Sequence, residues 1–382
     1  MSWKEASVEE QRMKFITAVL HEESAFNEIC MRFGISRKTG YKWYNRFLKK
    51  GEGGLKDLSS ARHNQPEQTS EVIVNAILAI KKRFSYWGPR KIYSRLISHH
   101  PHIEAPSKST IENILKKHDL TLNKITRRKV PGTAPLAHCS EVNAIWCYDF
   151  KGWFLTGNGD KCEPFTLTDA HSRYLLKCTH MKRKRTEDVW NVFNMAFHEY
   201  GLPLRVRSDN GPPFATFGAG RLSRLSMLLI KAGVTPEWIT PGKPQENGRH
   251  ERFHLTLKQE TANPPANNLL TQERLFRDFQ SYYNHERPHE ALGQVPPATI
   301  YTTSYRKWDG VLRSPEYPEH YEKRKIMKCG CIAWLGGNYF ISETLYGEYV
   351  GLWEVGNGYY NIYYGSIQLG QIDLRKGFKK VA

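Results

Sequence analysis

The chain of 382 residues lacks an apolar run long enough to span a lipid bilayer. Its first residues, Met1-Ser-Trp-Lys-Glu, do not have the basic and apolar pattern of a signal peptide. We find neither a basic amphipathic helix nor a lipidation signal, the features that binding to an acidic membrane surface would require. We therefore expect a cytoplasmic protein without a membrane partner.

Cysteine is scarce, and its spacing is irregular. The seven cysteines are odd in number, which fits reduced thiols better than a disulfide framework. Cys329-Gly-Cys331 is the one close pair and would supply half of a zinc site. No second pair of Cys or His lies at metal-binding spacing, so zinc is the less favoured interpretation.

Acidic residues are few relative to basic ones. Lys and Arg number 56 against 38 Asp and Glu, a formal net charge of +18. Such an excess indicates a polyanionic partner, because cations that neutralise phosphates release counterions and gain affinity without reading sequence. We therefore expect nucleic acid as the partner.

Residues 1–52 are predicted to form a helix-turn-helix DNA-binding domain. Ser7-Val-Glu-Glu10 is a capping box, Gly34 ends a second helix, and Ser36 caps a basic third helix. A third helix of this kind enters the major groove. The alternative is an ordinary three-helix bundle with a solvated basic face, and the overall charge favours DNA. The basic residues that we expect to contact DNA are Arg37, Lys38, Lys42 and Arg46.

Residues 68–120 are predicted to form a second domain like a helix-turn-helix. Ser70 caps its first helix, and Trp87-Gly-Pro-Arg-Lys opens its second. Trp87 is equally well explained as a core residue. Residues 121–140 then form a basic linker rich in Pro and Gly, with DNA contacts expected from Lys124, Arg127, Arg128 and Lys129.

Residues 141–300 have the pattern of an α/β core. Apolar runs at 144–150, 164–168 and 173–179 predict three strands, and helices and strands alternate after them. That order predicts a mixed sheet flanked by helices. A further helix is followed by the Pro-punctuated segment Tyr282-Tyr-Asn-His-Glu-Arg-Pro-His-Glu-Ala-Leu292. Residues 320–382 contain five short predicted strands, which indicate a small all-β barrel.

Three carboxylates occupy positions suited to metal binding. Asp149 ends an apolar run, Asp209 opens the turn Ser208-Asp-Asn-Gly211, and Glu251 lies near the start of the long helix 247–261. Carboxylates from separate elements hold hard divalent cations, and a metal pair can drive phosphoryl transfer. Taken singly, they are better explained as a paired surface Asp, a turn residue and a solvated helical Glu, respectively. Glu251 is expected to share its helical face with His254, Leu255 and Lys258.

Together, these segments resemble a known family. Tyr148-Asp149-Phe150, Ser208-Asp-Asn-Gly-Pro-Pro-Phe214 and Thr240-Pro-Gly-Lys-Pro-Gln-Glu-Asn-Gly-Arg-His-Glu251-Arg-Phe-His-Leu-Thr-Leu-Lys258 are similar to the core of DDE transposases of bacterial insertion sequences. Retroviral integrases are related to that family. The helical segments Phe33-Gly-Ile-Ser-Arg-Lys-Thr-Gly-Tyr-Lys-Trp43 and Trp87-Gly-Pro-Arg-Lys-Ile92 resemble the branch with paired helix-turn-helix modules.

The resemblance implies an RNase H-like core and a small SH3-like C-terminal barrel. It also implies that Asp149, Asp209 and Glu251 are catalytic and hold two Mg²⁺ ions, with Mn²⁺ as a substitute and no nucleotide cofactor. The implied enzyme cleaves DNA at the terminal inverted repeats and transfers the 3′-hydroxyl into target DNA, as at least a dimer. Lys258 is expected to contact DNA near the cut end. A DNA-binding regulator with an inactive core and a plain nuclease are the alternatives.

Glu246 is the rival for the third carboxylate, because its distance from Asp209 is closer to the retroviral spacing. Glu251 is preferred, since the frame Pro-Gln-x-Asn-Gly-x-x-Glu and the downstream Thr-Leu-Lys align only with it. A further acidic residue, Asp169, lies in the turn Asp169-Ala-His-Ser-Arg173 and is interpreted as structural.

Overall fold

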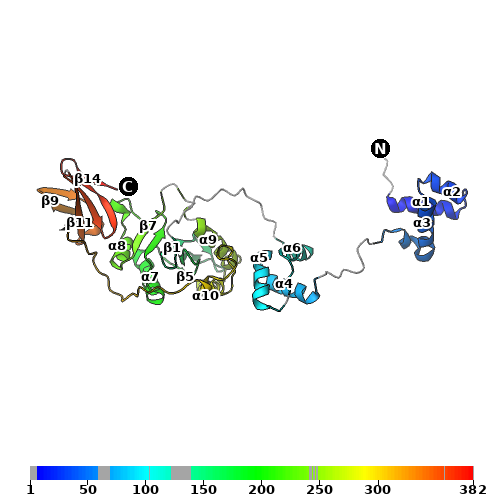
Figure 1. Ribbon diagram of the computed structural model, residues 1–382, viewed down its shortest axis with the longest axis horizontal. Coiled ribbons are helices and arrows are strands. Elements are labelled where there is room, and N and C mark those ends of the chain that lie inside the picture. The colour runs from blue at the N-terminus through cyan, green and yellow to red at the C-terminus, as the bar shows by residue number, and fades with distance from the viewer. Residues whose placement is uncertain are drawn as a thin grey trace. The chain divides into compact units, whose positions relative to one another are not determined.

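The computed structural model describes residues 7–58, 69–102, 104–121, 139–240, 243, 246, 248–356 and 358–381. The chain divides into two compact units, Met1–Gln68 and Thr69–Ala382. Figure 1 shows the order of the elements along the chain. The linker residues expected to contact DNA, Lys124, Arg127, Arg128 and Lys129, lie outside the described residues.

The first unit consists of three helices, α1 (Val8–Leu20), α2 (Phe26–Arg32) and α3 (Arg37–Lys50), followed by the 3₁₀ turn η1 (Gly51–Leu55). The expected capping box is present, because Ser7 Oγ accepts from Glu10 N at 3.2 Å and Glu10 Oε2 accepts from Ser7 N at 3.0 Å. Ser36 caps α3 in a similar way, with its Oγ 3.2 Å from Thr39 N. Local sequence therefore defines where both helices begin.

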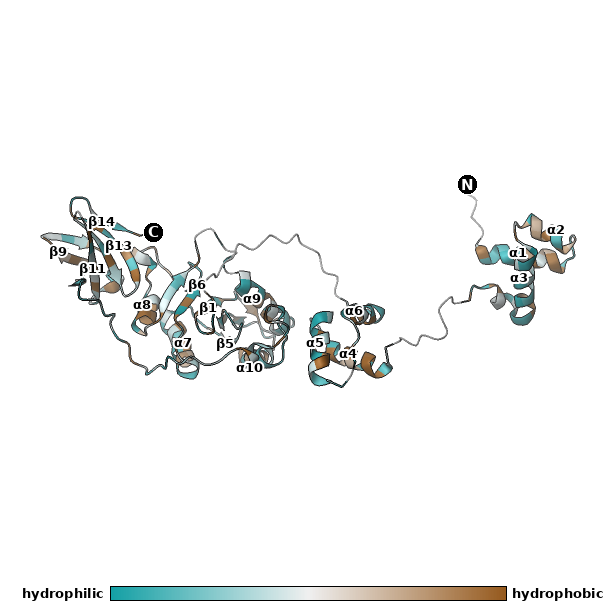
Figure 2. Cartoon of the chain, viewed as in Figure 1, coloured by the Kyte–Doolittle hydropathy of each residue, from teal (hydrophilic) through white to brown (hydrophobic). Residues whose placement is uncertain are grey.

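The core of this unit is small and depends on one close approach between helices. A Cβ placed on Gly40 of α3 would lie 2.6 Å from Cys30 Sγ and 3.1 Å from the ring of Phe15. Only a residue without a side chain lets α3 pack this closely on α1 and α2. Most of α3 is hydrophilic, as its colour in Figure 2 shows, so one face packs and the rest is exposed.

The second unit begins with three more helices, α4 (Glu71–Arg83), α5 (Pro89–His99) and α6 (Lys108–Lys117). Pro89 occupies the first turn of α5, where its missing N–H has no partner to lose. Ser107 caps α6 through its Oγ, 3.1 Å from Thr110 N. Among the described residues of this module, the buried apolar core consists of Ile77, Trp87, Ile92, Leu96, Ile111 and Leu115.

A mixed five-stranded sheet forms the centre of the second unit. Its strands are β1 (Ile145–Phe150), β4 (Pro164–Asp169), β5 (Leu175–His180), β6 (Arg205–Ser208) and β7 (Thr235–Trp238). They lie in the order β5-β4-β1-β6-β7. The β1–β4 and β4–β5 pairs are antiparallel, whereas β1–β6 and β6–β7 are parallel. Two short strands, β2 (Phe154–Leu155) and β3 (Lys161–Cys162), form a separate hairpin.

Helices cover both faces of this sheet. On one face, α7 (Thr186–Tyr200) and α8 (Arg224–Lys231) enclose a core that contains Trp146 and Tyr148. On the other face, α9 (Gly248–Thr261) and α10 (Leu269–His285) pack on Leu175 and Cys178. Because successive side chains of a strand point to opposite faces, Asp149 lies on the face of α9. The expected α/β core with helices on both faces is confirmed.

The C-terminal region is all β, as expected, and no closed barrel is found among its described residues. The 3₁₀ turns η4 (Glu290–Leu292) and η5 (Pro297–Thr299) lead to it, and η6 (Glu343–Leu345) lies within it. An antiparallel sheet has the order β14-β13-β12-β11-β8, and β9 pairs only with β10 in the described part of the chain. The seven strands are β8 (Glu322–Lys325), β9 (Cys331–Trp334), β10 (Gly337–Phe340), β11 (Tyr349–Gly356), β12 (Tyr359–Tyr364), β13 (Ile367–Asp373) and β14 (Gly377–Lys380).

Two strands of this region were missed by sequence reasoning. The strand β8 reads Glu-Lys-Arg-Lys and has no alternation of apolar residues, so pairing with β11 alone makes it a strand. The edge strand β14 is short and ends in two lysines. The hairpin β9–β10 lies beside the two edge strands of the five-stranded sheet, β8 and β14, without pairing with either in the described residues. Apolar side chains, rather than strand pairing, join the hairpin to the sheet. Alternation of residues predicts strands but does not predict closure.

The β-rich region packs on the α/β core through η2 (Ala219–Arg221) and α8. Ala219 and Leu222 belong to its buried cluster, and Lys231 of α8 pairs with Glu348 at 2.8 Å. Across the parts of the chain that the structure describes, no helix combines the length and the apolar character needed to cross a membrane.

Candidate active site

The register of two parallel strands brings Asp149 and Asp209 to the same end of the sheet. Ile145 pairs with Arg205 and Cys147 with Arg207, an offset of 60 positions (205 − 145). Continued by two residues, this offset places Asp149 opposite Asp209, at the carboxyl ends of β1 and β6. Ligands of open α/β sheets bind at this end of the strands.

The charges of both aspartates affect the pKa of Tyr148. Burial is the largest cause that raises the pKa of its hydroxyl, and the charges of Asp209 and Asp149 raise it further, against a hydrogen bond with Ser208. Both aspartate charges act on this one hydroxyl, which agrees with the strand register that places the two carboxylates at the same end of the sheet.

Backbone groups orient both aspartates. Asp209 Oδ1 accepts from Gly211 N at 3.0 Å, which makes the Asp-Asn-Gly segment a compact turn. Asn210 strengthens that turn, because its Nδ2 donates to Ile239 O at 2.9 Å and its Oδ1 accepts from Arg221 at 3.0 Å. Asp149 Oδ1 accepts from Phe150 N at 2.7 Å. Each carboxylate is half-buried and has a defined orientation.

Glu251 lies in the first turn of α9, on the exposed side of that helix. The opposite side buries Phe253 and Leu257 against the sheet and α10. Glu251 directly follows His250, and α9 packs beside β1. The helix therefore carries Glu251 to the same end of the sheet as Asp149, although its carboxylate forms no tight cluster with the two aspartates in the described structure.

Two buried histidines adjoin Asp149, and sequence reasoning missed them as site residues. Thr166 on β4 pairs in register with Asp149, and its Oγ1 lies 2.9 Å from His250 Nε2 and 2.8 Å from His254 Nε2. The same hydroxyl contacts Asp149 O at 3.2 Å. Ligand atoms of Asp149, His250 and His254 lie within 4.8 Å of one another, the one such cluster found among the described residues.

The placement of His254 corrects our expectation for α9. His254 was expected to share a face with Glu251 and Lys258, but it is 8% exposed whereas those two residues are exposed. His250 and His254 are four residues apart and therefore lie one above the other on the buried side. That spacing is the signal in the sequence that would have found the pair.

Burial keeps both histidines neutral. It lowers the pKa of His250 to about 3. Burial also lowers the pKa of His254, to about 2, with smaller contributions from His250 and Lys151. The two neutral imidazoles therefore contact the Thr166 hydroxyl without adding a positive charge next to Asp149.

Lys151 lies near both Asp149 and Lys258. Burial lowers the pKa of Lys151, nearby Lys258 lowers it further, and Asp149 opposes both. Lys151, Lys258 and Asp149 therefore share one neighbourhood at the edge of the sheet. Lys258 is exposed, so its ammonium is accessible to a phosphate.

Glu246 and Asp169 are held by local hydrogen bonds. Glu246 Oε2 accepts from Thr240 N at 2.8 Å, and this bond holds the pKa of its carboxyl below the usual value. Asp169 is fully buried and accepts from Asn143 N and from both donors of Ser172 at 2.6–2.8 Å. The contacts of Asp169 agree with the structural role that we expected for it.

The basic residues of α3 differ in their exposure to solvent and in their contacts. Arg37, Lys38 and Lys42 are exposed, whereas Arg46 is half-buried and donates to Lys56 O at 2.6 Å. The Arg46 guanidinium also lies 4.6 Å from the ring centre of Trp43. Three of the four expected DNA contacts are thus on an open face, and Arg46 helps to hold its own unit together.

The Cys329–Cys331 pair forms no metal site within the described chain. Cys331 Sγ lies 3.7 Å from the backbone oxygen of Cys329, and no group of three His, Cys, Asp or Glu ligands includes either thiol. A zinc ion needs about four such ligands.

Comparison with known families agrees with this architecture. Residues 140–244 and residues 232–297 each match a family described as an integrase core domain. Residues 11–63 match a helix-turn-helix domain, and residues 39–115 match a homeodomain-like domain. The chain therefore carries helix-turn-helix domains and an integrase core domain.

Its relatives among known proteins come from bacterial insertion elements. The chain is 24% identical over 245 residues to an uncharacterized 39.2 kDa protein of insertion element IS476 of Xanthomonas euvesicatoria, covering 63% of this chain and 67% of the relative. It is also 24% identical over 242 residues to a 31.7 kDa protein of IS407 of Burkholderia multivorans, covering 61% and 82%. The resemblance to integrase-core proteins of insertion sequences is confirmed.

Solved structures with a partial likeness include retroviral integrases. The catalytic core domain of BIV integrase is 21% identical with a TM-score of 0.32, over 42% of this chain and 93% of that one. A chain of the simian T-cell lymphotropic virus intasome is 15% identical with a TM-score of 0.36, over 80% and 99%.

Proposed function

We propose that this chain is a transposase that cleaves DNA at the ends of an insertion element and joins the exposed 3′-hydroxyl to target DNA. The placement of Asp149 and Asp209 carries this proposal. Two carboxylates at matching positions of adjacent parallel strands repel each other unless a cation lies between them. Oxygen ligands of this kind suit Mg²⁺. The integrase-core match and the insertion-element relatives support the same class of reaction.

Asp149, Asp209 and Glu251 are the proposed ligands of two Mg²⁺ ions, with Mn²⁺ as a substitute. The donor set fits, because it consists of carboxylates on three separate elements with two of them side by side. The ions would supply Lewis acidity, steadying the attacking and leaving oxygens of an in-line displacement. Glu251 would reach them by turning its exposed side chain toward the end of β1.

The surrounding residues hold this arrangement and receive the DNA. Strand pairing holds β6 beside β1, the Asp209 turn orients its carboxylate, and the Thr166–histidine contacts hold α9 on β4. Lys151 and Lys258 place two cations where the phosphates of an element end would lie, and Lys258 is the proposed direct contact. No nucleotide is needed, because joining exchanges one phosphodiester for another.

The helical domains are proposed to bind the terminal inverted repeats. Arg37, Lys38 and Lys42 form the open cationic face of α3, and Arg46 is the least available of the four residues expected there. Lys124, Arg127, Arg128 and Lys129 stay proposed phosphate contacts of the linker. Because one active site serves one end, the working unit is proposed to be at least a dimer on paired ends, acting on DNA of the bacterial nucleoid.

Substitution of the three carboxylates tests the proposal. Asp149→Asn, Asp209→Asn and Glu251→Gln should each abolish Mg²⁺-dependent cleavage and joining of labelled end DNA. Each variant should still shift end DNA in a gel, because none of them alters the helical domains.

Glu246→Gln is the matched control, since it removes the rival glutamate and leaves the proposed ligands intact. Loss of joining in Glu246→Gln, together with normal joining in Glu251→Gln, would show that Glu246 is the third ligand. Cleavage without joining by the unmodified protein would identify a plain nuclease. Binding without either reaction would identify a DNA-binding regulator.

A further inference from the structure

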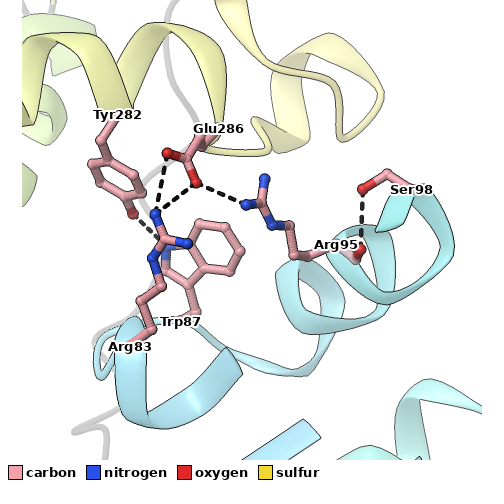
Figure 3. Close-up of polar contacts among 6 residues, drawn as sticks. All are labelled: Arg83, Trp87, Arg95, Ser98, Tyr282 and Glu286. Carbon is pink, nitrogen blue, oxygen red and sulfur yellow. Dashed lines mark hydrogen bonds and ion pairs between the residues drawn. The ribbon is translucent and has the colours of Figure 1, made fainter. Parts of the chain in front are cut away.

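The segment after the candidate active site, Tyr282 to Gln294, has no part in the chemistry proposed above. In the structure it faces the second helical module, α4 to α6. Figure 3 shows Tyr282 and Glu286 of this segment pointing toward Trp87, Arg83 and Arg95 of that module. The contact joins parts of the chain about 190 to 200 residues apart.

An aromatic stack forms the apolar part of this contact. The ring of Phe84 stacks on Trp87 with centroids 4.2 Å apart, and on Tyr282 with centroids 5.2 Å apart. Trp87 Nε1 donates to the Tyr282 hydroxyl at 2.6 Å, and Trp87 is 1% exposed. A tryptophan whose one polar group is satisfied by the other surface is typical of a specific interface.

A buried lysine fixes the turn that presents these rings. Lys81 is 6% exposed and donates through Nζ to Ser85 O at 2.5 Å and to Trp87 O at 3.1 Å. The two carbonyls belong to the turn between α4 and α5. The ammonium therefore holds together the backbone of the turn that carries Trp87.

Ion pairs surround the stack. Glu286 Oε2 lies 2.7 Å from Arg95 of α5 and 3.2 Å from Arg83 of α4, so one carboxylate accepts from two of the three helices of the module. The Arg95 side chain is only 14% exposed, which reduces screening by solvent. Farther along, Arg90 pairs with Glu290, and Ser94 Oγ donates to Gln294 O at 2.9 Å.

None of these contacts uses α6. Lys108, Lys116 and Lys117 are exposed on this helix, although Lys116 also pairs with Glu112 at 2.9 Å, and Ser107 caps its first turn. The module thus turns α5 and the end of α4 toward the core and leaves its third helix for another partner. A capped helix with exposed lysines suits the DNA backbone.

The same contact reaches the helix that carries Glu251. The Tyr282 hydroxyl also accepts from Arg287 Nη1 at 3.1 Å, and Arg287 pairs with Glu260 of α9. Arg287 is 8% exposed, so this pair is buried. Trp87, Tyr282, Arg287 and Glu260 therefore form one continuous set of polar contacts from the second helical module to α9.

We propose that Tyr282 to Gln294 is the docking site for the second helical module of the same chain. Docking holds α6 at a fixed position, so that duplex DNA bound along α6 is placed relative to the carboxylates on β1, β6 and α9. The DNA-positioning part of this inference rests on the proposed function, whereas the docking part does not.

Hydrogen exchange of the full-length protein tests docking without DNA. Glu286→Arg replaces two attractions by repulsions and should raise exchange of peptides from α5 and the end of α10 by about fivefold or more. The charge swap Glu286→Arg with Arg95→Glu restores one ion pair and should bring exchange back toward the original rate. Glu322→Arg is the control, because it makes the same charge change at the separate Arg324 pair. Unchanged exchange in α7 will show that the core is folded.

Equal exchange in Glu286→Arg and Glu322→Arg would overturn docking. Protection that weakens on dilution would overturn docking within one chain, since it would come from a second protomer.

Joining assays test the positioning of DNA. Glu286→Arg should lower joining about tenfold while end binding stays within about twofold of Glu322→Arg, and the swap should recover joining. Normal joining despite raised exchange, or equal losses of binding and joining, would overturn positioning. If the unmodified protein neither cleaves nor joins DNA, the proposed function and DNA positioning fail, and the exchange result still decides docking.

Discussion

Removing the hydroxyl of Thr166 should loosen α9 from the sheet. Thr166→Val keeps the shape of the side chain and deletes Oγ1, which lies 2.9 Å and 2.8 Å from the Nε2 atoms of His250 and His254. Both histidines are buried, so the two nitrogens would lose their partner without gaining water. A buried polar group left unsatisfied costs about 1–3 kcal/mol. Two such groups that relax in part should cost about 2–4 kcal/mol.

The assay is native-state hydrogen exchange of peptides from α9, because a single unfolding midpoint is poorly defined for a chain of several domains. A loss of about 2–4 kcal/mol corresponds to a roughly 30- to 700-fold faster exchange if opening of α9 governs it. Thr166→Ser should stay close to the original rate, because it keeps the hydroxyl.

Thr168→Val is the matched control on the same strand. Its Oγ1 lies 3.4 Å from both Cys147 O and His250 Nδ1, so it loses only long contacts. A change of less than about threefold is expected for it. If Thr166→Val exchanged no faster than Thr168→Val, the hydroxyl would not hold the histidines. That result would refute the inference that Thr166 holds α9, and with it Glu251, at the end of the sheet where Asp149 lies.

Further predictions concern acid stability, helix packing and DNA contact. Between pH 6.5 and about 3 the unfolded chain binds protons that folded His250 and His254 do not bind, so stability of the core falls as the pH falls. Near pH 5.5 the loss should be about 1.4 kcal/mol per histidine in hydrogen exchange of α9, and equal stability at pH 7.5 and 5.5 would contradict it. Gly40→Ala should destabilise the first unit by about 1–3 kcal/mol, seen as faster exchange in α1 to α3. Cys30→Ala should recover part of that loss, since Cys30 Sγ lies 2.6 Å from the added Cβ, and failure to recover would implicate Phe15 instead. Lys258→Ala should lower the slope of log affinity against log salt by about one for all DNA sequences, and an unchanged slope in fluorescence anisotropy would exclude a phosphate contact.

Much of the local structure could be predicted because short-range chemistry governs it. The Ser7 capping box and the Ser36 cap appear where the sequence placed them, since each needs only residues within one helical turn. Apolar runs likewise predicted the strands of the core. Asp149 and Asp209 could be assigned to strand ends, but their proximity depends on the parallel pairing of β1 with β6, whose strands are distant in sequence.

Other features were missed because their partners are distant. The histidines of α9 were not recognised as neighbours of Asp149, since Thr166 joins them from a different strand. Arg46 was predicted only as a DNA contact, whereas in the structure its guanidinium donates a hydrogen bond to the backbone oxygen of Lys56. The C-terminal strands were largely predicted, but whether they close into a barrel depends on how edge strands meet.

The sequence by itself therefore determined the helix ends, the strands with apolar alternation, the basic character and the family resemblance. Each of these follows from neighbouring residues or from the order of motifs. The tertiary structure alone decided that α9 turns His254 inward, that the C-terminal strands divide into a five-stranded sheet and a separate hairpin, and that Trp87 meets Tyr282. Those outcomes depend on burial and pairing between segments up to about 200 residues apart, and local propensity carries no information about such contacts.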